Sequence, residues 1–100
     1  KQVDSLNIII NNTNSTNIEL ANAYLTLSDI LPDDTMFYFC NKAKEIAEQA
    51  LKEDIKSKEK RLLLETLSGA LINLGYVYDY KGDALKAINY YIKALRIKKE

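Results

Sequence analysis

The chain of 100 residues contains no histidine and no tryptophan, and only one cysteine, one proline and three glycines. A lone cysteine, Cys40, cannot form an internal disulfide, and without a second cysteine or a histidine no typical structural zinc site can be completed. No nucleophile has a partner base at a recognisable spacing, and no glycine loop that could cradle a phosphate is present. The sequence therefore predicts no cofactor, no metal site and no catalytic residue, so any enzymatic activity would belong to a domain outside this chain.

The chain also lacks an excess of charge of one sign. Fourteen basic and fourteen acidic residues cancel, and no long run of one sign gives the electrostatic footprint of a protein that binds nucleic acid or anionic membrane. No apolar run approaches the roughly 20 residues of a membrane helix, and no signal-peptide pattern opens the chain. We expect no nucleic-acid partner and no membrane insertion. Because residue 1 is lysine rather than methionine, we expect that upstream sequence was removed.

Almost half of the side chains are apolar, which is enough for one small core, so we expect a single domain or a piece of one. Few glycines and prolines and no alternating valine-rich runs favour an all-α fold. Apolar residues recur at helical spacing in five stretches. The predicted helices are residues 2–11, 16–31, 35–53, 58–80 and 84–99.

Polar residues at the boundaries predict how these helices begin. Asp33 and Asp34 come just ahead of the third helix, where carboxylates can accept amide hydrogens and complement the helix dipole. Their alternative interpretation as a divalent-ion site is disfavoured, because no further oxygen-ligand spacing follows them. The other expected N-caps are Ser15 or Thr16, Ser57 and Asp83, with Gly82 ending the fourth helix.

The stretch from residue 71 to 95 carries the most specific pattern. A small glycine, Gly75, lies on one face of the fourth helix among bulky residues, and two alanines flank a tyrosine on one face of the fifth. The residues of this expected packing seam are Leu71, Leu74, Gly75, Tyr78, Ala87, Tyr91 and Ala94. Their order and spacing over residues 68–100 resemble the tetratricopeptide repeat, a helix–turn–helix unit that stacks into an α-α superhelix.

Two positions depart from the family pattern: Leu71 replaces a frequent tryptophan, and Lys99 replaces the usual terminating proline. We therefore expect the last helix, and the protein, to continue. A degenerate repeat is expected over residues 15–53, before the clearer repeat at 58–99, with the segment 2–11 as an extra helix. Its seam residues are Leu20, Ala21, Tyr24, Met36, Cys40 and Ala43. Cys40 is then a small buried residue; the alternative, a reactive thiol, requires a neighbouring base or cation.

The opening helix with VDSL, the polar turn after it, the helix PDDTMFYFCNKAKEIAEQA, the charged turn KSKEK and the ending from residue 71 together carry a second resemblance. Through them the whole chain is similar to tetratricopeptide regions found ahead of a membrane helix in sensor histidine kinases and related regulators of Bacteroidetes-type bacteria. That resemblance implies an extracytoplasmic or juxtamembrane sensing module, with a cytoplasmic location as the alternative. A stacked repeat leaves a concave surface for a protein or peptide partner. The residues expected on this surface are Ile18, Asn22, Leu25, Thr26, Ile72, Asn73, Tyr76, Asp79 and Tyr80. The basic clamp of chaperone-binding relatives is not expected, because Ile72 and Tyr76 stand in its place.

Two functions are compatible with these patterns. The first is capture of a protein or peptide by exposed tyrosines, which combine a large rigid ring with a hydroxyl; these tyrosines could instead only cover the edge of the core. The second is a structural spacer that holds copies together, because the last helix of a repeat array normally needs a cover. Ile92, Leu95 and Ile97 are the residues expected on that uncovered flank.

Overall fold

The computed structural model describes residues 2–30 and 33–99, and in these residues it contains five α-helices and no strand. The helices are α1 (Gln2–Asn11), α2 (Asn17–Ile30), α3 (Asp33–Leu51), α4 (Ser57–Tyr80) and α5 (Ala84–Lys99). The prediction of an all-α chain of about five helices is confirmed. The molecule is a flat slab of 39 × 33 × 17 Å, and its thickness corresponds to about two layers of helices of ~10 Å diameter.

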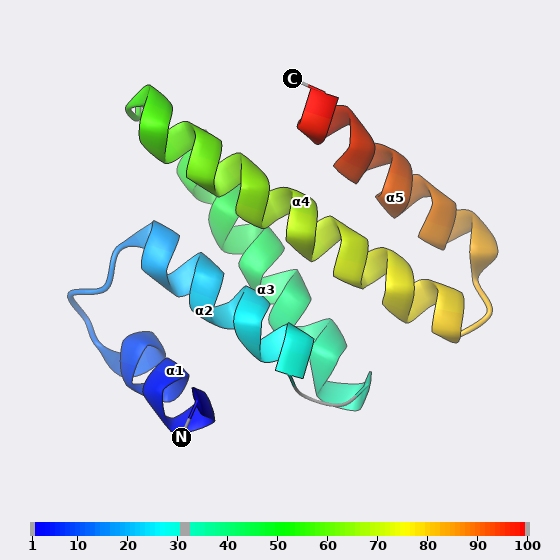
Figure 1. Cartoon of the computed structure of the whole chain (residues 1–100), viewed down its shortest axis with the longest axis horizontal. Helices are drawn as coiled ribbons and strands as arrows, with labels where there is room; N and C mark the ends of the chain where they lie inside the picture. The colour runs from blue at the N-terminus through cyan, green and yellow to red at the C-terminus, as the bar shows by residue number, and fades with distance from the viewer. Residues whose placement is uncertain (1, 31–32, 100) are drawn as a thin grey trace.

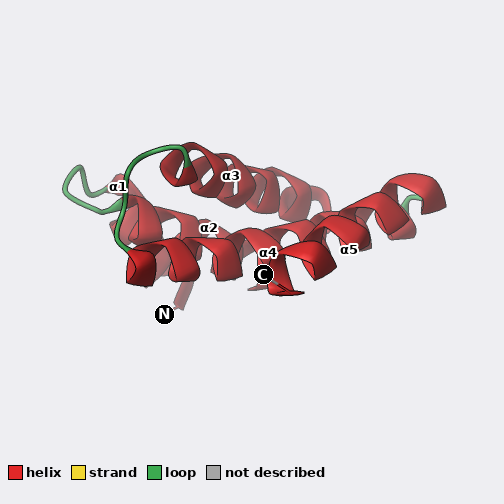
Figure 2. Cartoon of the chain, turned by 90° about the horizontal axis from the view of Figure 1, so that it is seen from above, coloured by secondary structure: helices red, strands yellow, loops and turns green. Residues whose placement is uncertain are grey.

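The order of the helices in space follows their order in the chain. α1 packs on α2, α2 on α3, α3 on α4 and α4 on α5, and α2 also lies against α4. α4 runs diagonally through the molecule, with α5 beside it at one edge and α1 at the opposite edge (Figure 1). α3 covers one side of the layer that contains α2 and α4 (Figure 2). Among the described helices, none covers the opposite side of that layer (Figure 2).

Local sequence sets the start of α2 and the turn between α4 and α5. The amide of Thr16 donates to Glu19 Oε1 at 2.8 Å, and the amide of Glu19 donates to Thr16 Oγ1 at 3.1 Å. This reciprocal pair is a capping box. At the other turn, Gly82 takes a φ of +87°, and Asp83 Oδ1 accepts the amide of Lys86 at 3.2 Å. The expected caps Thr16 and Asp83 are confirmed.

The C-terminus of α4 ends in a Schellman motif. The amide of Asp83 donates to the Tyr78 carbonyl at 2.8 Å, and the amide of Gly82 donates to the Asp79 carbonyl at 3.0 Å. These two bonds satisfy carbonyls that a helix end otherwise leaves free. The positive φ of Gly82 makes the reversal possible without the penalty that a Cβ would bring.

The predicted bounds of three helices differ from the structure. α2 begins at Asn17 rather than at residue 16, and its predicted end at residue 31 lies outside the described residues. α4 begins at Ser57 itself, and its N-cap is Lys56, which is extended and makes no side-chain cap bond. Ser57 is therefore not the cap. α3 runs from Asp33 to Leu51, two residues earlier at each end than predicted, so Asp33 and Asp34 lie in its first turn rather than ahead of it. Leu51 and Ile55 pack against the core, so the segment between α3 and α4 is held by apolar contacts rather than by a capping hydroxyl.

The core is built from small residues on α3 and leucines on α4. Ala43, Ala47 and Ala50 on α3 are buried, and their short side chains allow the backbone of α3 to approach α4 closely. Leu63 and Leu67 on α4 form one core cluster with Ala47 and Ala50 of α3. The other buried apolar residues are Ala21, Ala23, Leu27, Cys40, Ala70, Leu71, Leu74, Val77, Ala87 and Ala94.

Candidate protein-binding face

The candidate site lies on α4. Neighbouring helices cover three sides of α4, and the remaining side is exposed. On the side of α5, the Ser68 hydroxyl donates to the Ala94 carbonyl at 3.3 Å. On the side of α2, the Thr66 hydroxyl donates to Asn22 Oδ1 at 2.6 Å. On the side of α3, Tyr78 meets the ring of Phe37 edge to face. Side chains that follow none of these three directions are left to solvent.

The seam between α4 and α5 is formed by the residues that the sequence predicts. Leu71, Leu74, Ala87 and Ala94 are buried, and Gly75 is buried with them. A Cβ added to Gly75 would lie 2.6 Å from Cε1 of Tyr91, which is closer than real Cβ contacts. Gly75 therefore provides the room for the ring of Tyr91, although 38% of Tyr91 remains exposed. This close approach is the one that the glycine–tyrosine spacing predicts.

Tyr78, the remaining seam residue, is half-buried at the centre of an aromatic cluster. Its ring stacks on Tyr90 at a centroid distance of 5.6 Å and meets Phe37 at 6.2 Å. Three lysines of the α4–α5 hairpin lie over rings of this cluster, at 5.0 to 5.5 Å from the ring centroids. They are Lys81 over Phe37, Lys86 over Tyr78 and Lys93 over Tyr90. These cation–π contacts direct all three ammonium groups toward the aromatic cluster.

The uncovered side of α4 carries apolar and aromatic side chains. Ile72 is 37%, Tyr76 48% and Tyr80 69% exposed, and Asp79 beside them is also exposed. Steps of four residues place Ile72, Tyr76 and Tyr80 along one line of the helix surface. We call Ile72, Tyr76, Asp79 and Tyr80 the open face. It combines two phenol rings, one aliphatic side chain and one carboxylate.

Three further residues expected on this surface instead join helices. Asn73 Nδ2 donates to Ser28 Oγ and to Asp29 Oδ1, both at 2.8 Å, and so ties α4 to α2. Asn22 Oδ1 accepts the Thr66 hydroxyl. Ile18 is half-buried against the core cluster that contains Leu63 and Ala94. The side chains of these three residues make contacts within the molecule, so we do not include them in the open face.

The two other residues expected from the first repeat are also engaged within the molecule. Leu25 is half-buried, and its Cδ2 lies 3.0 Å from the position that a Cβ on Gly69 would take. The Thr26 hydroxyl donates to the Asn22 carbonyl one turn earlier in α2 at 2.8 Å. The candidate face is therefore a property of α4 alone rather than of α2 and α4 together.

A cleft between the N-terminal half of α4 and the end of α5 is a feature that sequence reasoning missed. Its lining residues are Ser57, Lys60, Arg61, Leu64, Glu65, Ser68, Gly69, Ile97 and Lys98. It contains three cations and one carboxylate, so its chemistry suits an acidic side chain. Its two walls come from residues about 30 positions apart, which no local periodicity connects; the mixed charges of residues 52–61 indicated only a solvated helix end.

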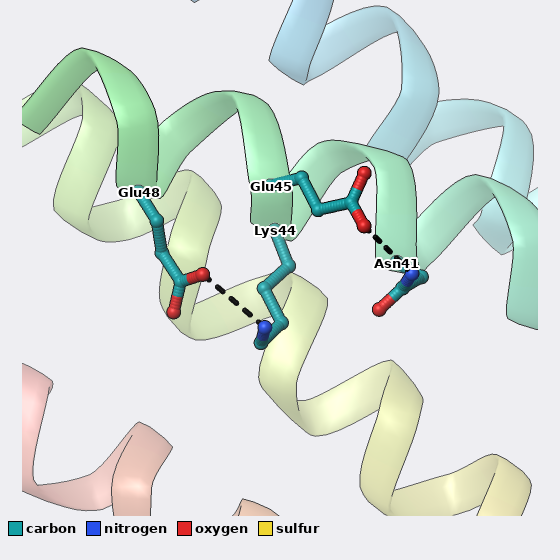
Figure 3. A network of polar contacts seen from close by, with 4 residues as sticks. All are labelled: Asn41, Lys44, Glu45 and Glu48. Carbon is teal, nitrogen blue, oxygen red and sulfur yellow. Dashed lines mark hydrogen bonds and ion pairs between the residues drawn. The ribbon is translucent and has the colours of Figure 1, made fainter.

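The outer surface of α3 differs from the open face, because polar pairs cover it. Lys44 Nζ lies 3.2 Å from Glu48 Oε1, and Asn41 Nδ2 donates to Glu45 Oε2 at 3.2 Å (Figure 3). Both pairs join residues four apart on one helix and stabilise it by only about 0.2–0.5 kcal/mol each. These four residues are polar, whereas Tyr38 on the same helix is 55% exposed.

The described residues contain one free thiol, that of Cys40, and it lies in the core. Cys40 is completely buried, its thiol donates to the Phe37 carbonyl at 3.5 Å, and burial raises its pKa to about 11. A thiol held protonated in this way is a poor nucleophile. Within residues 2–30 and 33–99, no three acidic, cysteine or histidine side chains gather as metal ligands, and no helix is long and apolar enough to span a bilayer.

No family model matches the chain, and no curated protein and no solved structure is significantly similar to it.

Proposed function

We propose that this chain is a protein- or peptide-binding module and that its partner docks on the open face of α4. The observation that carries the proposal is the line of Ile72, Tyr76 and Tyr80, which remain 37 to 69% exposed on the one side of α4 that α2, α3 and α5 leave free. Apolar side chains gathered on one exposed surface are characteristic of interaction sites.

The residue types suit a partner that presents an apolar or aromatic side chain beside a donor group. Tyrosine contributes a large rigid contact area and loses little side-chain entropy on binding, which is why it is common among interface anchors. Asp79 lies one residue before Tyr80 and can accept hydrogen bonds from an amide or a cation of the partner. Binding of this kind is reversible and requires no cofactor.

The close contact of Gly75 with Tyr91 supports the proposal that the α4–α5 hairpin is a tetratricopeptide-type repeat, since the small residue of that repeat has this role. From the resemblance of the sequence to tetratricopeptide regions of bacterial sensor kinases, we further propose that the module serves signal reception, outside the cytoplasm or next to the membrane. The pairing of α2 with α3 and of α4 with α5 in chain order is compatible with two such repeats.

A second candidate function is that of a structural spacer which holds copies of the chain together. The observation that favours it is a set of exposed apolar side chains on α5, separate from the open face. Peptide capture and self-association predict different results in the absence of any ligand. If the chain is a spacer, its oligomer size should depend on protein concentration in the absence of ligand. If it only captures peptides, its oligomer size should not change.

The test of peptide binding uses the wild-type chain as bait for a displayed library of random peptides. An enriched peptide is then titrated by calorimetry against Tyr76→Ala and Tyr80→Ala. Each variant should lose about 1 kcal/mol or more of binding free energy while keeping its helical circular dichroism. Equal affinities for wild type and both variants would place the site elsewhere.

The matched control is Tyr38→Ala, because Tyr38 is 55% exposed on α3, on the other layer of the molecule. This variant also removes an exposed tyrosine, and it should bind the enriched peptide with wild-type affinity. Loss of the fold in Tyr76→Ala or Tyr80→Ala would show that these rings cover the core edge, which is the alternative that the sequence leaves open.

A further inference from the structure

The exposed surface of α5 carries four large aliphatic side chains in a symmetric order. Leu85 is 77%, Ile88 51%, Ile92 42% and Leu95 55% exposed. They follow one another at steps of three, four and three residues, so they lie on one side of the helix. We call these four residues the α5 stripe. Both the residue types and the spacing read the same from either end of the helix.

The α5 stripe lies away from the core. Tyr90 and Ile97, which are seven residues apart and share another side of α5, are half-buried against the core cluster. Ile97 was expected on the uncovered flank, but it fills the space beside the leucines of α4 instead. α5 lies at the edge of the molecule and packs against α4 alone among the described helices (Figure 1). The stripe is therefore open along its whole length.

We propose that the α5 stripe is a self-association surface on which α5 of a second copy of this chain packs antiparallel. A two-fold axis halfway between Ile88 and Ile92 places Leu85 of each copy beside Leu95 of the other, and Ile88 beside Ile92. Isologous contacts of this kind require a surface that is complementary to itself after a half turn. The three–four–three order of Leu, Ile, Ile and Leu meets that requirement in sequence and in spacing.

The charges around the stripe favour the antiparallel arrangement. Arg96, Lys98 and Lys99 lie in the last turn of α5, and a parallel pair would bring the six cations of two copies together. An antiparallel pair separates the two basic ends and places each near Asp79 and Asp83 of the other copy. Opposite charges at the rim fix orientation and register more than they add affinity.

Three lysines near Asp79 and Asp83 or along α5 do not cancel the attraction between these carboxylates and the basic end of the other copy. Lys81, Lys86 and Lys93 lie over the rings of Phe37, Tyr78 and Tyr90, within the aromatic cluster. Their ammonium groups are thus directed toward the side of α5 that faces the core. The carboxylate of Asp79 is exposed, and that of Asp83 is half-exposed at the helix N-terminus.

The expected complex is weak. A standard stable interface has roughly 20 to 30 residues on each side, whereas the stripe supplies four large side chains and their neighbours. Sedimentation velocity should therefore be followed up to millimolar chain concentration. The wild-type chain should form dimers, and Ile88→Glu and Leu95→Glu should each shift the dissociation constant upward by tenfold or more. The matched control is Ile8→Glu, because Ile8 is 69% exposed on α1 at the opposite edge of the molecule (Figure 1), and this variant should dimerise like the wild type.

Orientation is tested by cross-linking in a Cys40→Ala background, with one new cysteine per chain. A mixture of Leu85→Cys and Leu95→Cys chains should form mainly mixed disulfide dimers under mild oxidation, while each variant alone should cross-link slowly. If the two α5 helices packed parallel, each variant alone should cross-link faster than the mixture. A wild-type chain that stays monomeric at millimolar concentration, equal dimerisation of Leu95→Glu and wild type, or faster cross-linking within each variant would each overturn the proposal.

This inference does not depend on peptide binding at the open face. Tyr76→Ala and Tyr80→Ala leave the α5 stripe intact and should dimerise like the wild type. Ile88→Glu and Leu95→Glu leave the open face intact and should bind the enriched peptide like the wild type. The failure of one proposal is thus distinguishable from the failure of the other.

Discussion

At the scale of single residues, small side chains decide how closely the helices approach. Gly75 makes room for the ring of Tyr91, and Ala43 and Ala47 on α3 are buried without any exposed surface. Cys40 belongs with these residues, since it is as completely buried as the alanines. Its position favours the interpretation as a small apolar residue over that as a reactive thiol.

Replacement of Gly75 by leucine should destabilise the α4–α5 seam. The new Cβ would lie 2.6 Å from Tyr91 Cε1, so the ring must move and the larger side chain must find space. We expect a loss of about 1 to 3 kcal/mol in the free energy of unfolding, measured by urea denaturation. In a Tyr91→Ala background most of this loss should disappear, because the overlapping ring is absent. An unchanged melting temperature would count against the seam.

Cys40 should make stability depend on alkaline pH. Burial raises the thiol pKa from 9.0 to about 11, so the folded state holds a proton that the unfolded chain releases at lower pH. The stabilisation is complete below pH 9 and is lost as the pH rises through 11. At pH 10.5 the loss attributable to this thiol should be about 2 kcal/mol. The measurement is the decrease in unfolding free energy between pH 8.5 and 10.5.

The matched control for this effect is Cys40→Ala. The variant retains every other ionisable side chain of the chain. The decrease with pH should be smaller in the variant by the amount given above. Identical pH profiles for the two chains would show that the thiol is not desolvated in the folded state.

At the scale of elements, α4 is joined to its three neighbours by different kinds of contact. Leucines and alanines join it to α3, the Gly75–Tyr91 contact joins it to α5, and hydrogen bonds from Asn73 and Thr66 join it to α2. The polar contacts on the α2 side use the side chains of Asn73 and Thr66 within the molecule, so these two residues are not part of the open face.

Asn73→Ala should therefore reduce stability without changing peptide binding. The substitution removes two hydrogen bonds of 2.8 Å to Ser28 and Asp29, and a typical intramolecular hydrogen bond contributes about 0.5 to 1.5 kcal/mol. We expect a loss of about 1 to 2 kcal/mol in thermal or chemical unfolding. Wild-type stability combined with weakened peptide capture would return Asn73 to the binding surface.

At the scale of the whole molecule, the helices form a chain of neighbours, so stability is not shared equally. Among the described helices, α2 and α4 each contact three others, whereas α1 packs on α2 alone. A hydrogen bond from the Ser15 hydroxyl to the Ile9 carbonyl at 2.8 Å holds the end of α1 to the following loop. Ile8 is 69% exposed. Little buried surface thus stabilises this helix.

Native-state hydrogen exchange should reveal this difference. Amides of α1 should exchange fastest among the five helices, through local openings that cost much less than global unfolding. Amides in the middle of α4, near Leu71 and Leu74, should exchange only with global unfolding, because those leucines are buried on the α3 and α5 sides. Equal protection of α1 and α4 would show that the chain unfolds as one cooperative unit.

The sequence by itself determined the number of helices, most of their bounds and the composition of the seam. Helical periodicity, the Thr16 and Asp83 caps and the positive-φ glycine at 82 are properties of neighbouring residues, so they can be read without a fold. The same holds for the seam spacing of Gly75 and Tyr91. In both cases the signal lies within one turn of a helix or within one hairpin.

Only the tertiary structure decided which side chains remain open. Asn73 and Ile72 are adjacent in sequence and separated by 100° around α4, yet one is bonded to α2 and the other is exposed. The same distinction separates Ile97, which packs on the core, from Leu95, which does not. The spacing of apolar residues within a helix predicts which side of it is buried. Whether a residue at the border of that side is buried or exposed depends on where the neighbouring helices lie. Their positions are set by contacts between residues far apart in the chain, such as Asn73 with Ser28.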